Sequence, residues 1–176
     1  MTGTCSVLLR QCFLFVLVGA IALVSFASPV FALSPSTSPM IAAIFRFSGK
    51  RPTNLGLQSN GGLLACPNSP NCVSSYSTDT EHAIAPLAPT DSLEATFQKL
   101  KALLETKSNV KLITATDDYL YAEFTSALMG FVDDVEFYLD PTAGVIQVRS
   151  ASRLGESDLG VNRKRIEAIR TELANA

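Results

Sequence analysis

Residue types that build metal and redox centres are scarce in this sequence of 176 residues. It contains no tryptophan, one histidine and four cysteines, and only 17% of its residues are charged. Structural zinc sites usually take four Cys or His ligands, and the sequence has no glycine-rich phosphate loop and no G-x-S-x-G or H-E-x-x-H pattern. With a formal net charge of −2, the chain also lacks the basic patch that neutralises phosphates. We therefore expect no metal, no cofactor and no nucleic-acid partner.

Charge is scarcest at the start of the chain, where Arg10 is the only charged residue among the first 32. It precedes an uncharged apolar run, FLFVLVGAIALVSF, over residues 13–26. Val30 and Ala32 then occupy the −3 and −1 positions of a cut after Ala32. A positive start, a short apolar middle and a small-residue exit are typical of a secretory signal peptide. Residues 1–32 are therefore interpreted as the signal peptide of an exported protein.

The same stretch has a second interpretation as an uncleaved membrane anchor. From Cys12 to Leu33 it approaches the roughly 20 residues that cross a bilayer. Pro29 near its end and the good cut site favour cleavage instead. Neither Cys5 nor Cys12 follows the apolar run, so a lipoprotein is not expected.

Beyond Ala32 the sequence predicts an extended lead and then one domain, because the remaining length suits a single core. The lead, residues 33–62, is rich in serine, proline and glycine. Its apolar patch, residues 40–47, is expected either to pack on the body as a helical turn or to lie against a membrane surface. Residues 63–174 form the predicted domain.

Hydrophobic periodicity predicts two helices and several strands. Residues 91–107 form a helix with an apolar stripe, behind an expected capping box of Asp91 and Glu94. The second helix covers residues 158–174, with Ser157 or Asp158 as its N-cap. Strands are expected over residues 110–115, 119–127, 131–139 and 144–152, with a short one over 82–87. This order gives an α+β fold: a two-layer sandwich in which two helices cover one face of an antiparallel sheet of three to five strands.

Residues 66–75 read CPNSPNCVSS and hold two cysteines six positions apart. A metal site would need more ligands than Cys66, Cys72 and His82. A thioredoxin-like pair has two intervening residues, not five, and nothing in the sequence places His82 beside a cysteine nucleophile. The favoured interpretation is a structural Cys66–Cys72 disulfide, because an exported protein meets an oxidising compartment and the intervening Pro and Asn residues favour a turn. Free thiols are the alternative.

Residues 149–165, RSASRLGESDLGVNRKR, combine the end of a strand with the start of a helix. Arginines around a helix N-terminus form a candidate site for a phosphate, a carboxylate or a lipid headgroup. The alternative is a structural network of caps and ion pairs. The candidate binding residues are Arg149, Ser150, Ser152, Arg153, Ser157, Asp158, Asn162 and Arg163, together with Asn71 and Ser74 of the cysteine segment.

A carboxylate cluster falls on the strand predicted over residues 131–139. Alternation places Asp133 on the apolar face with Phe131, and Asp134 and Glu136 on the opposite face. Paired carboxylates can perform acid–base chemistry or bind a hard cation, but a carboxylate on an apolar face needs a partner. We expect a structural ion pair of Asp133 or Asp134 with Arg149 on the next strand.

Four stretches together carry a family resemblance. RPTNLG (51–56), CPNSPNCVSS (66–75), GFVDDVEF (130–137) and VRSASRLGESDLGVNRKRIE (148–167) are similar to the uncharacterised family known as domain of unknown function 1499. The resemblance extends over about residues 50–173, and the export signal followed by SGKRPTNLG looks like that of cyanobacterial and plastid members. It implies a place in the periplasm or thylakoid lumen, or on a membrane facing one of them. It implies no substrate, because the family carries no established activity.

The function expected from these observations is that of a non-catalytic exported binding or assembly module with an anion or headgroup site. Its site would join residues 149–165 to the cysteine segment, and its partner would be a small anionic ligand or a membrane-associated protein complex. The alternative is an enzyme, either a thiol oxidoreductase that uses Cys66 and Cys72 or a hydrolase that uses Ser74 or Ser75.

Overall fold

A computed structural model describes residues 47–176 of the chain. The predicted signal peptide, its alternative as an anchor, and the lead up to residue 46 lie outside the described residues. Within the described part the elements are, in chain order, β1 (Cys72–Ser74), α1 (Leu93–Thr106), β2 (Val110–Ala115), β3 (Tyr119–Thr125), β4 (Val132–Asp140), β5 (Val145–Ser152) and α2 (Val161–Ala174).

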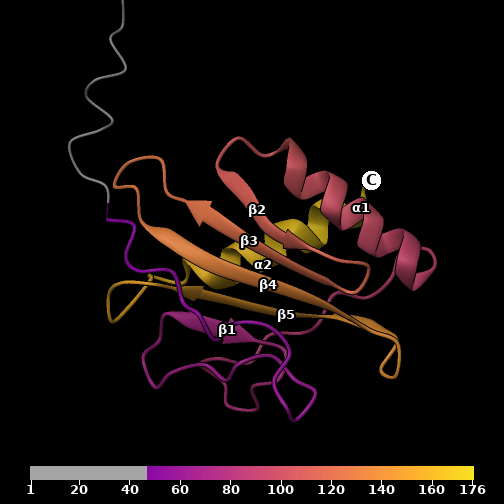
Figure 1. The fold of residues 1–176 in the computed structure, drawn as a ribbon, viewed down its shortest axis with the longest axis horizontal. Helices are drawn as coiled ribbons and strands as arrows, with labels where there is room; N and C mark the ends of the chain where they lie inside the picture. Colours follow the sequence, from indigo (N-terminus) through magenta and orange to yellow (C-terminus); the bar gives the residue numbers. More distant parts are fainter. Residues whose placement is uncertain (1–46) are drawn as a thin grey trace, which may run out of the picture. The chain divides into compact units, whose positions relative to one another are not determined.

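The strands form one antiparallel sheet in the order β1-β5-β4-β3-β2 (Figure 1). Strands β2 to β5 follow one another along the chain, whereas β1 pairs with β5 at the edge of the sheet. In that pairing Cys72 stands opposite Ala151, and Ser74 stands opposite Arg149. The sheet edge therefore joins the cysteine segment directly to the arginine-rich segment.

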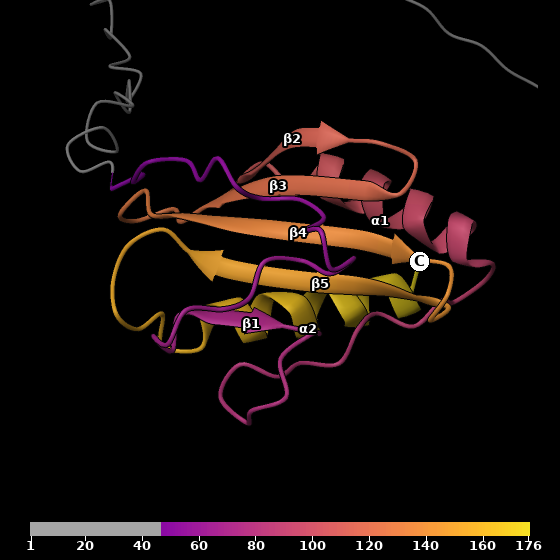
Figure 2. The same ribbon diagram turned by 60° about the horizontal axis from the view of Figure 1, so that its bottom comes forward.

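Both helices pack on one face of the sheet, as the turned view in Figure 2 shows. Helix α1 buries Phe97, Leu100 and Leu104, and α2 buries Ile166, Ile169 and Leu173, all in one core with side chains of the sheet. The spacing of three and four residues in each helix puts these side chains on a single stripe. The predicted fold class, an α+β sandwich, is confirmed.

Alternation along the central strand also determines which side chains enter the core. Val135, Phe137 and Leu139 of β4 lie in the core cluster, as their two-residue spacing predicts. Phe131 was expected on the same face but precedes the strand, and 39% of its surface is exposed. The two-residue period holds only within the strand, so it does not place the loop residue before it.

Helix α1 begins one residue later than the expected capping box requires. Ser92 is the N-cap, and its hydroxyl accepts a hydrogen bond of 3.1 Å from the backbone N–H of Ala95. The predicted box of Asp91 and Glu94 is wrong in register, and Asp91 instead forms a 2.7 Å ion pair with Lys99. A serine and an aspartate are similarly good caps, so the sequence alone does not choose between neighbours.

The first turn of helix α2 is capped by the side chain of a residue that precedes the N-cap position. Its N-cap is Gly160, with φ of 76°, rather than Ser157 or Asp158. The Asp158 carboxylate nevertheless accepts the backbone N–H groups of Gly160 at 2.9 Å and Asn162 at 2.7 Å. The carboxylate of Asp158 thus binds free backbone N–H groups at the start of α2, as predicted, although it does not occupy the N-cap position. The N-cap position has a left-handed backbone conformation that glycine adopts without strain and a bulkier residue does not.

The short strand expected over residues 82–87 is replaced by two isolated bridges, Ser74 with Ala83 and Leu87 with Ile146. Pro86 lies between them, and proline cannot donate to a strand ladder. The unexpected strand is β1, because its three residues are too few to show a period.

The face of the sheet opposite the helices is covered by the lead. The backbone N–H of Gly56 donates a 2.8 Å hydrogen bond to Glu136 of β4, and the guanidinium of Arg51 lies 2.5 Å from Glu123 of β3. Glu136 is fully buried as a result. The last part of the predicted extended lead therefore packs on the domain, and we call the covered surface the outer face.

Candidate functional site

On the helix face, Asn162 joins the cysteine segment, β5 and α2. Its side-chain oxygen accepts hydrogen bonds of 2.5 Å from both Ser150 and Arg165. Its amide nitrogen donates to the Asn71 carbonyl at 2.9 Å and to the Ser152 hydroxyl at 3.0 Å. Asn162 has no exposed surface, and these four bonds use its whole hydrogen-bonding capacity. This cluster is structural rather than open to a ligand.

Arg165 also supplies the partner of Asp133, which carries a carboxylate onto the helix face. One of its terminal nitrogens bonds Asp133, and its guanidinium lies 4.8 Å from the ring centre of Phe124. The expected pairing of Asp133 with Arg149 is therefore wrong. Arg149 stands opposite Glu136 in the β4–β5 register, so its side chain points to the outer face instead.

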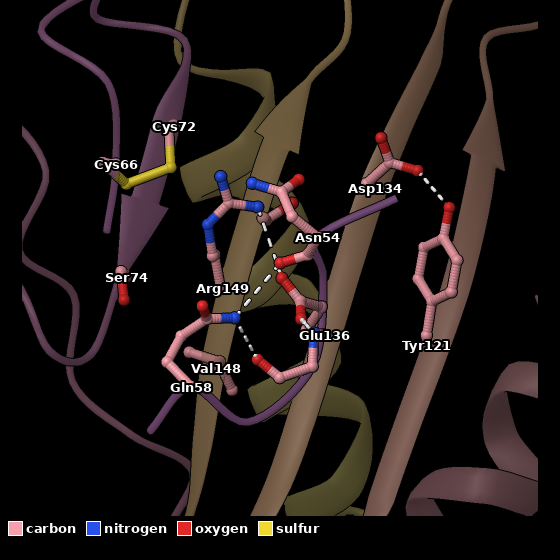
Figure 3. A network of polar contacts seen from close by, with 12 residues as sticks. Asn54, Gln58, Cys66, Cys72, Ser74, Tyr121, Asp134, Glu136, Val148 and Arg149 are labelled. Carbon is pink, nitrogen blue, oxygen red and sulfur yellow. Dashed lines mark hydrogen bonds and ion pairs between the residues drawn. A yellow bond between two sulfur atoms is a disulfide. The ribbon is translucent and has the colours of Figure 1, made fainter. Parts of the chain in front are cut away.

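On the outer face, Arg153 occupies the centre of a polar cluster. Its guanidinium donates to both oxygens of Asp134, at 2.9 and 2.6 Å, to the Tyr121 hydroxyl at 3.1 Å, and to Glu123. The Tyr121 hydroxyl donates in turn to Asp134 at 2.5 Å (Figure 3). Hydrogen bonds from Arg153 to Asp134, against the opposing effect of burial, raise the arginine's pKa. Asp134 is thus paired with Arg153, not with Arg149 as expected.

Glu123 is a carboxyl whose pKa this cluster lowers strongly. The hydrogen bond from Arg51 is the main cause that lowers its pKa to about 2, with burial opposing and Arg153 adding to the shift. The lead residue Arg51 therefore fastens the covering segment to the sheet through a carboxylate that stays ionised.

Arg149 is the least satisfied charged group of the outer face. Its Nη1 is 3.3 Å from Glu136, whose other oxygen accepts from Gly56 N–H and from the Tyr119 hydroxyl, both at 2.8 Å. Burial, followed by the neighbouring Glu136 carboxylate, raises the pKa of Tyr119. Arg149 is 5% exposed, and its Nε is the buried side-chain nitrogen or oxygen without a hydrogen-bond partner among residues 47–176. Buried polar atoms are nearly always paired, so this atom needs an explanation.

Arg163 is not free for an anion either. Its guanidinium donates to the backbone carbonyls of Ala83 at 2.7 Å and Glu81 at 2.9 Å, which ties α2 to the loop after β1. Ser157, another candidate, accepts the N–H of Leu159 at 3.3 Å on the surface. Of the arginines in the predicted anion site, only Arg149 keeps an unused buried donor.

The cysteine segment is closed as predicted by the Cys66–Cys72 disulfide, with Cα atoms 5.6 Å apart. The loop closed by this disulfide contacts the end of β5 and the residues that follow it. The side-chain amide of Asn71 donates a hydrogen bond of 2.6 Å to the Gly155 carbonyl, and the Ser152 N–H donates one of 2.9 Å to the Asn71 carbonyl. The staple thus holds the loop against the end of β5.

Beside the staple lies a cavity of about 680 Å³ between the lead and the loop after β1. Its wall residues are Gln58, Ser59, Asn60, Gly62, Leu63, Leu64, Ala65, Cys66, Pro67, Asn68, Ser74, Tyr76, Ser77, Thr78, Asp79 and His82. Ser74 is almost fully buried at this wall, directly across the strand pair from Arg149. In Figure 3 the Nε side of Arg149 faces Ser74 and the disulfide. We call this space the staple cavity.

His82 and Asp79 form a hydrogen-bonded pair at the cavity wall. Asp79 lies 2.8 Å from His82 Nδ1, and the Ser69 carbonyl lies 3.2 Å from Nε2. Burial lowers the pKa of His82, but the hydrogen bonds to Asp79 and Ser69 outweigh it and raise that pKa. Each ring nitrogen therefore has an oxygen in hydrogen-bond range, and a role as base for a serine would require Nε2 to leave the Ser69 carbonyl.

The two serines proposed for a hydrolase are also engaged. The Ser75 hydroxyl donates to the side chain of Gln147 at 2.7 Å and accepts the Val148 N–H at 2.9 Å. The Ser74 hydroxyl accepts the N–H of Tyr76 at 3.2 Å. Neither hydroxyl has a hydrogen bond to His82 in the described part of the chain.

Several residues of these clusters were not predicted from the sequence, namely Tyr119, Tyr121, Glu123, Arg51, Gly56 and Arg165. Tyr121 and Glu123 alternate with apolar residues along β3, so their shared face was readable from the pattern. Their partners come from distant segments, and no local signal points to them. Gly56 and Arg51 lie in the RPTNLG stretch, which is the only hint of their role.

Metal-binding clusters and membrane-crossing helices are both absent from the described residues. Residues 47–176 contain no group of three or more His, Cys, Asp or Glu side chains arranged to hold a metal ion. In the same part of the chain, neither helix is long and apolar enough to cross a membrane.

The fold and its clusters define a class: a small, disulfide-containing α+β domain whose single antiparallel sheet carries buried ionic networks on both faces. Within that class, residues 62–173 match the family described as a protein of unknown function, DUF1499. The match covers well over half of the sequence, and the chain belongs to this family. No curated protein and no solved structure matches the chain.

Proposed function

We propose that this protein is a non-catalytic exported binding module that holds a small anionic ligand in the staple cavity. The observation that carries the proposal is Arg149, whose buried Nε has no hydrogen-bond partner and whose side chain stands across from the cavity residue Ser74. Side chains paired across antiparallel strands have Cβ atoms about 5 Å apart. A carboxylate or phosphate oxygen seated beside Ser74 would therefore lie within reach of this donor.

The electrostatics of the outer face support an anion. Arg149 shares Glu136 with two other donors, Gly56 and Tyr119, so its charge is incompletely matched. Arginine presents a planar fork of donors suited to carboxylate and phosphate. The staple cavity is within the usual size range of about 300–1,000 Å³ for small-molecule sites.

The cavity walls are held in place before any ligand arrives. The disulfide fixes one wall at Cys66. Gln58 fixes another, because its amide nitrogen donates to the carbonyls of Asn54 at 3.1 Å and Gly56 at 2.8 Å (Figure 3). A wall that is already ordered loses little entropy when a ligand binds.

The test compares melting temperatures in phosphate and in chloride at equal ionic strength and pH. Phosphate is expected to raise the melting temperature of the full chain, since a ligand at tenfold its Kd stabilises by about 1.4 kcal/mol. Arg149→Lys should abolish the rise, because lysine keeps the charge but lacks the Nε donor. Acetate and succinate, titrated in the same way, would separate carboxylate from phosphate preference.

The matched control is Arg170→Lys. Arg170 lies on α2 and donates to the backbone carbonyls of Pro86 and Ala85, both at 2.7 Å, and neither it nor these two residues line the staple cavity. This variant should keep the full phosphate response. The proposal fails if the wild-type melting temperature does not respond to any of the three anions, or if Arg149→Lys responds as strongly as wild type.

Export rests on separate support. A Cys66–Cys72 disulfide fits a periplasmic or lumenal location, because thiols in reducing compartments stay reduced. Fractionation of cells, with alkylation of free thiols before lysis, tests this. A chain recovered from the reducing compartment with both thiols alkylated would overturn the location without bearing on the cavity.

The alternative function is an enzyme, and the His82–Asp79 pair at the cavity wall is the observation that favours it. An enzyme that uses this pair would lose turnover in His82→Gln, while a binding module would keep its phosphate response in the same variant. A thiol oxidoreductase would exchange its disulfide with glutathione, whereas a structural disulfide resists mild reductant.

A further inference from the structure

The loop from β3 to β4 and the loop from β5 to α2 lie at one end of the domain (Figure 1). Exposed apolar side chains lie on these loops and at the first residue of α2. Leu128 is 88% exposed and Leu159 is 85% exposed, on two different loops. Phe131, Leu154 and Val161 are each about 40–50% exposed and line a groove of about 270 Å³ with Leu159. We call the surface formed by these five residues the apolar end.

Leu159 is presented to solvent in an unusual backbone conformation. Its φ is 54°, and no other described residue except glycine has a positive φ. A branched side chain in this region is disfavoured, and such positions persist where the surroundings impose them, often at functional sites. Here Asp158 fixes the following N–H of Gly160 and thereby the turn. The turn directs a large apolar side chain outward, where it contributes nothing to the core.

The rest of the chain joins the domain at this same end. The ring of Phe47 stacks on Phe131 with ring centres 5.4 Å apart, and the Phe47 N–H donates to the Met129 carbonyl at 3.3 Å. The sequence that leads to Phe47 has no charged residue between the predicted cut after Ala32 and position 45. An uncharged segment is therefore attached at the end of the domain that carries the exposed apolar side chains.

We propose that the apolar end rests on a lipid bilayer, with Leu128 and Leu159 reaching below the headgroups. Interfacial proteins bury apolar side chains about 5–10 Å into the headgroup and acyl boundary. Lys50 is exposed three residues after Phe47 and would meet anionic headgroups at that depth. The proposal goes beyond ligand binding in the staple cavity and is independent of it.

A lipid surface fits this end better than a protein partner does. A stable protein interface buries at least about 1,000 Å² in a well-matched surface, whereas here the most exposed side chains stand singly on two loop tips. The sequence from 33 to 45, which remains after the predicted cut, also adds no charge that would oppose contact with lipid.

The test uses the absence of tryptophan from the sequence. The full chain carrying Leu159→Trp is reconstituted into vesicles of phosphatidylcholine with a minority of phosphatidylglycerol. The Trp emission should shift to shorter wavelength and be quenched about twofold or more by lipids brominated on the acyl chain, at the depth expected for an interfacial side chain. Circular dichroism and melting temperature verify that the variant is folded.

The matched control is Thr142→Trp, in the exposed turn between β4 and β5. Strand β4 has nine residues, so this turn lies roughly 25 Å from the apolar end. Its Trp should keep the emission of an aqueous side chain and escape quenching, although the protein that carries it is bound to the same vesicle.

A second pair of variants separates insertion from simple proximity. Leu128→Asp, introduced into the Leu159→Trp chain, should reduce the quenching, because a carboxylate resists entering lipid. Ala143→Asp at the opposite end should leave it unchanged. The proposal is overturned if Trp at 159 stays unquenched or if the Trp at 142 is quenched equally. It is also overturned if the emission shifts without vesicles: a shift that grows with protein concentration would indicate a second copy on this surface, and one independent of concentration would indicate the chain's own segment.

Discussion

The side-chain amide of Asn162 donates a 2.9 Å hydrogen bond to the backbone carbonyl of Asn71, a residue 91 positions away. This bond joins the start of α2 to the stapled cysteine loop at the edge of the sheet. It links the two stretches that stand out most in the sequence, CPNSPNC and RSASRLGESDLGVNR. Their shared role is to build one buried network.

Replacing Asn162 by alanine should therefore be severe. The change removes buried hydrogen bonds to the Ser150 hydroxyl, Arg165, the Asn71 carbonyl and the Ser152 hydroxyl, and each such bond contributes about 0.5–1.5 kcal/mol. We expect a loss of about 3 kcal/mol in the free energy of unfolding, measured by urea denaturation. The control Asn175→Ala, at the exposed end of α2, should change stability by less than about 0.5 kcal/mol. Equal effects for the two variants would contradict the proposed role of the network.

Removing the disulfide should weaken the fold without abolishing it. The loop between Cys66 and Cys72 is short, so the chain-entropy estimate is about 2 kcal/mol. The double variant Cys66→Ala, Cys72→Ala should melt at a lower temperature than wild type. Reductant should lower the melting temperature of wild type and leave that of the variant unchanged. If reductant has no effect on wild type while thiol counting shows the bridge to be open, the staple is not stabilising.

Acid should lower the free energy of unfolding through protonation of Glu123 on the outer face. The pKa of this carboxyl is about 2 in the folded protein, chiefly because of the hydrogen bond from Arg51. A depressed pKa contributes stability that is present above the unfolded value near 4.5 and is lost as pH falls toward 2. Because Arg51 is half exposed, we expect on the order of 2 kcal/mol from this group.

The measurement is urea unfolding between pH 6 and about pH 2. Glu123→Gln removes the titrating group and should flatten the acid slope over that range. Glu94→Gln, on the exposed side of α1, serves as the matched control and should keep the slope. A wild-type slope that survives in Glu123→Gln would assign the acid sensitivity to other carboxylates.

His82 should titrate in the opposite sense. Its hydrogen bonds to Asp79 and Ser69 outweigh burial and raise its pKa. A raised pKa gives stability that is fully present below the unfolded value near 6.5 and is lost as pH rises through the folded value. Since His82 is the only histidine, NMR of its ring protons reports this pKa without ambiguity. Asp79→Asn should lower the pKa, and an unchanged value in that variant would show that the pair does not control it.

The sequence by itself determined the layers of this protein. Apolar residues three and four apart predict α1 and α2, and alternation in β3, β4 and β5 predicts which side chains face them. Both periods follow from backbone geometry, so they need no knowledge of distant contacts. The cysteine pair and the family stretches were also evident, because both are local in the chain.

Only the tertiary structure decided the partners of the charged residues. Strand order pointed to Arg149 as the partner of Asp133 or Asp134, and this was wrong for both carboxylates. Strand register puts Arg149 opposite Glu136, and the packing of α2 brings Arg165 to Asp133. The folded lead covers the outer face and forms one wall of the staple cavity. Its contacts with the sheet join residues about 70 to 80 positions apart, which no local pattern predicts. A period along one segment describes the face that a side chain occupies, whereas the group it meets depends on how distant segments fold over that face.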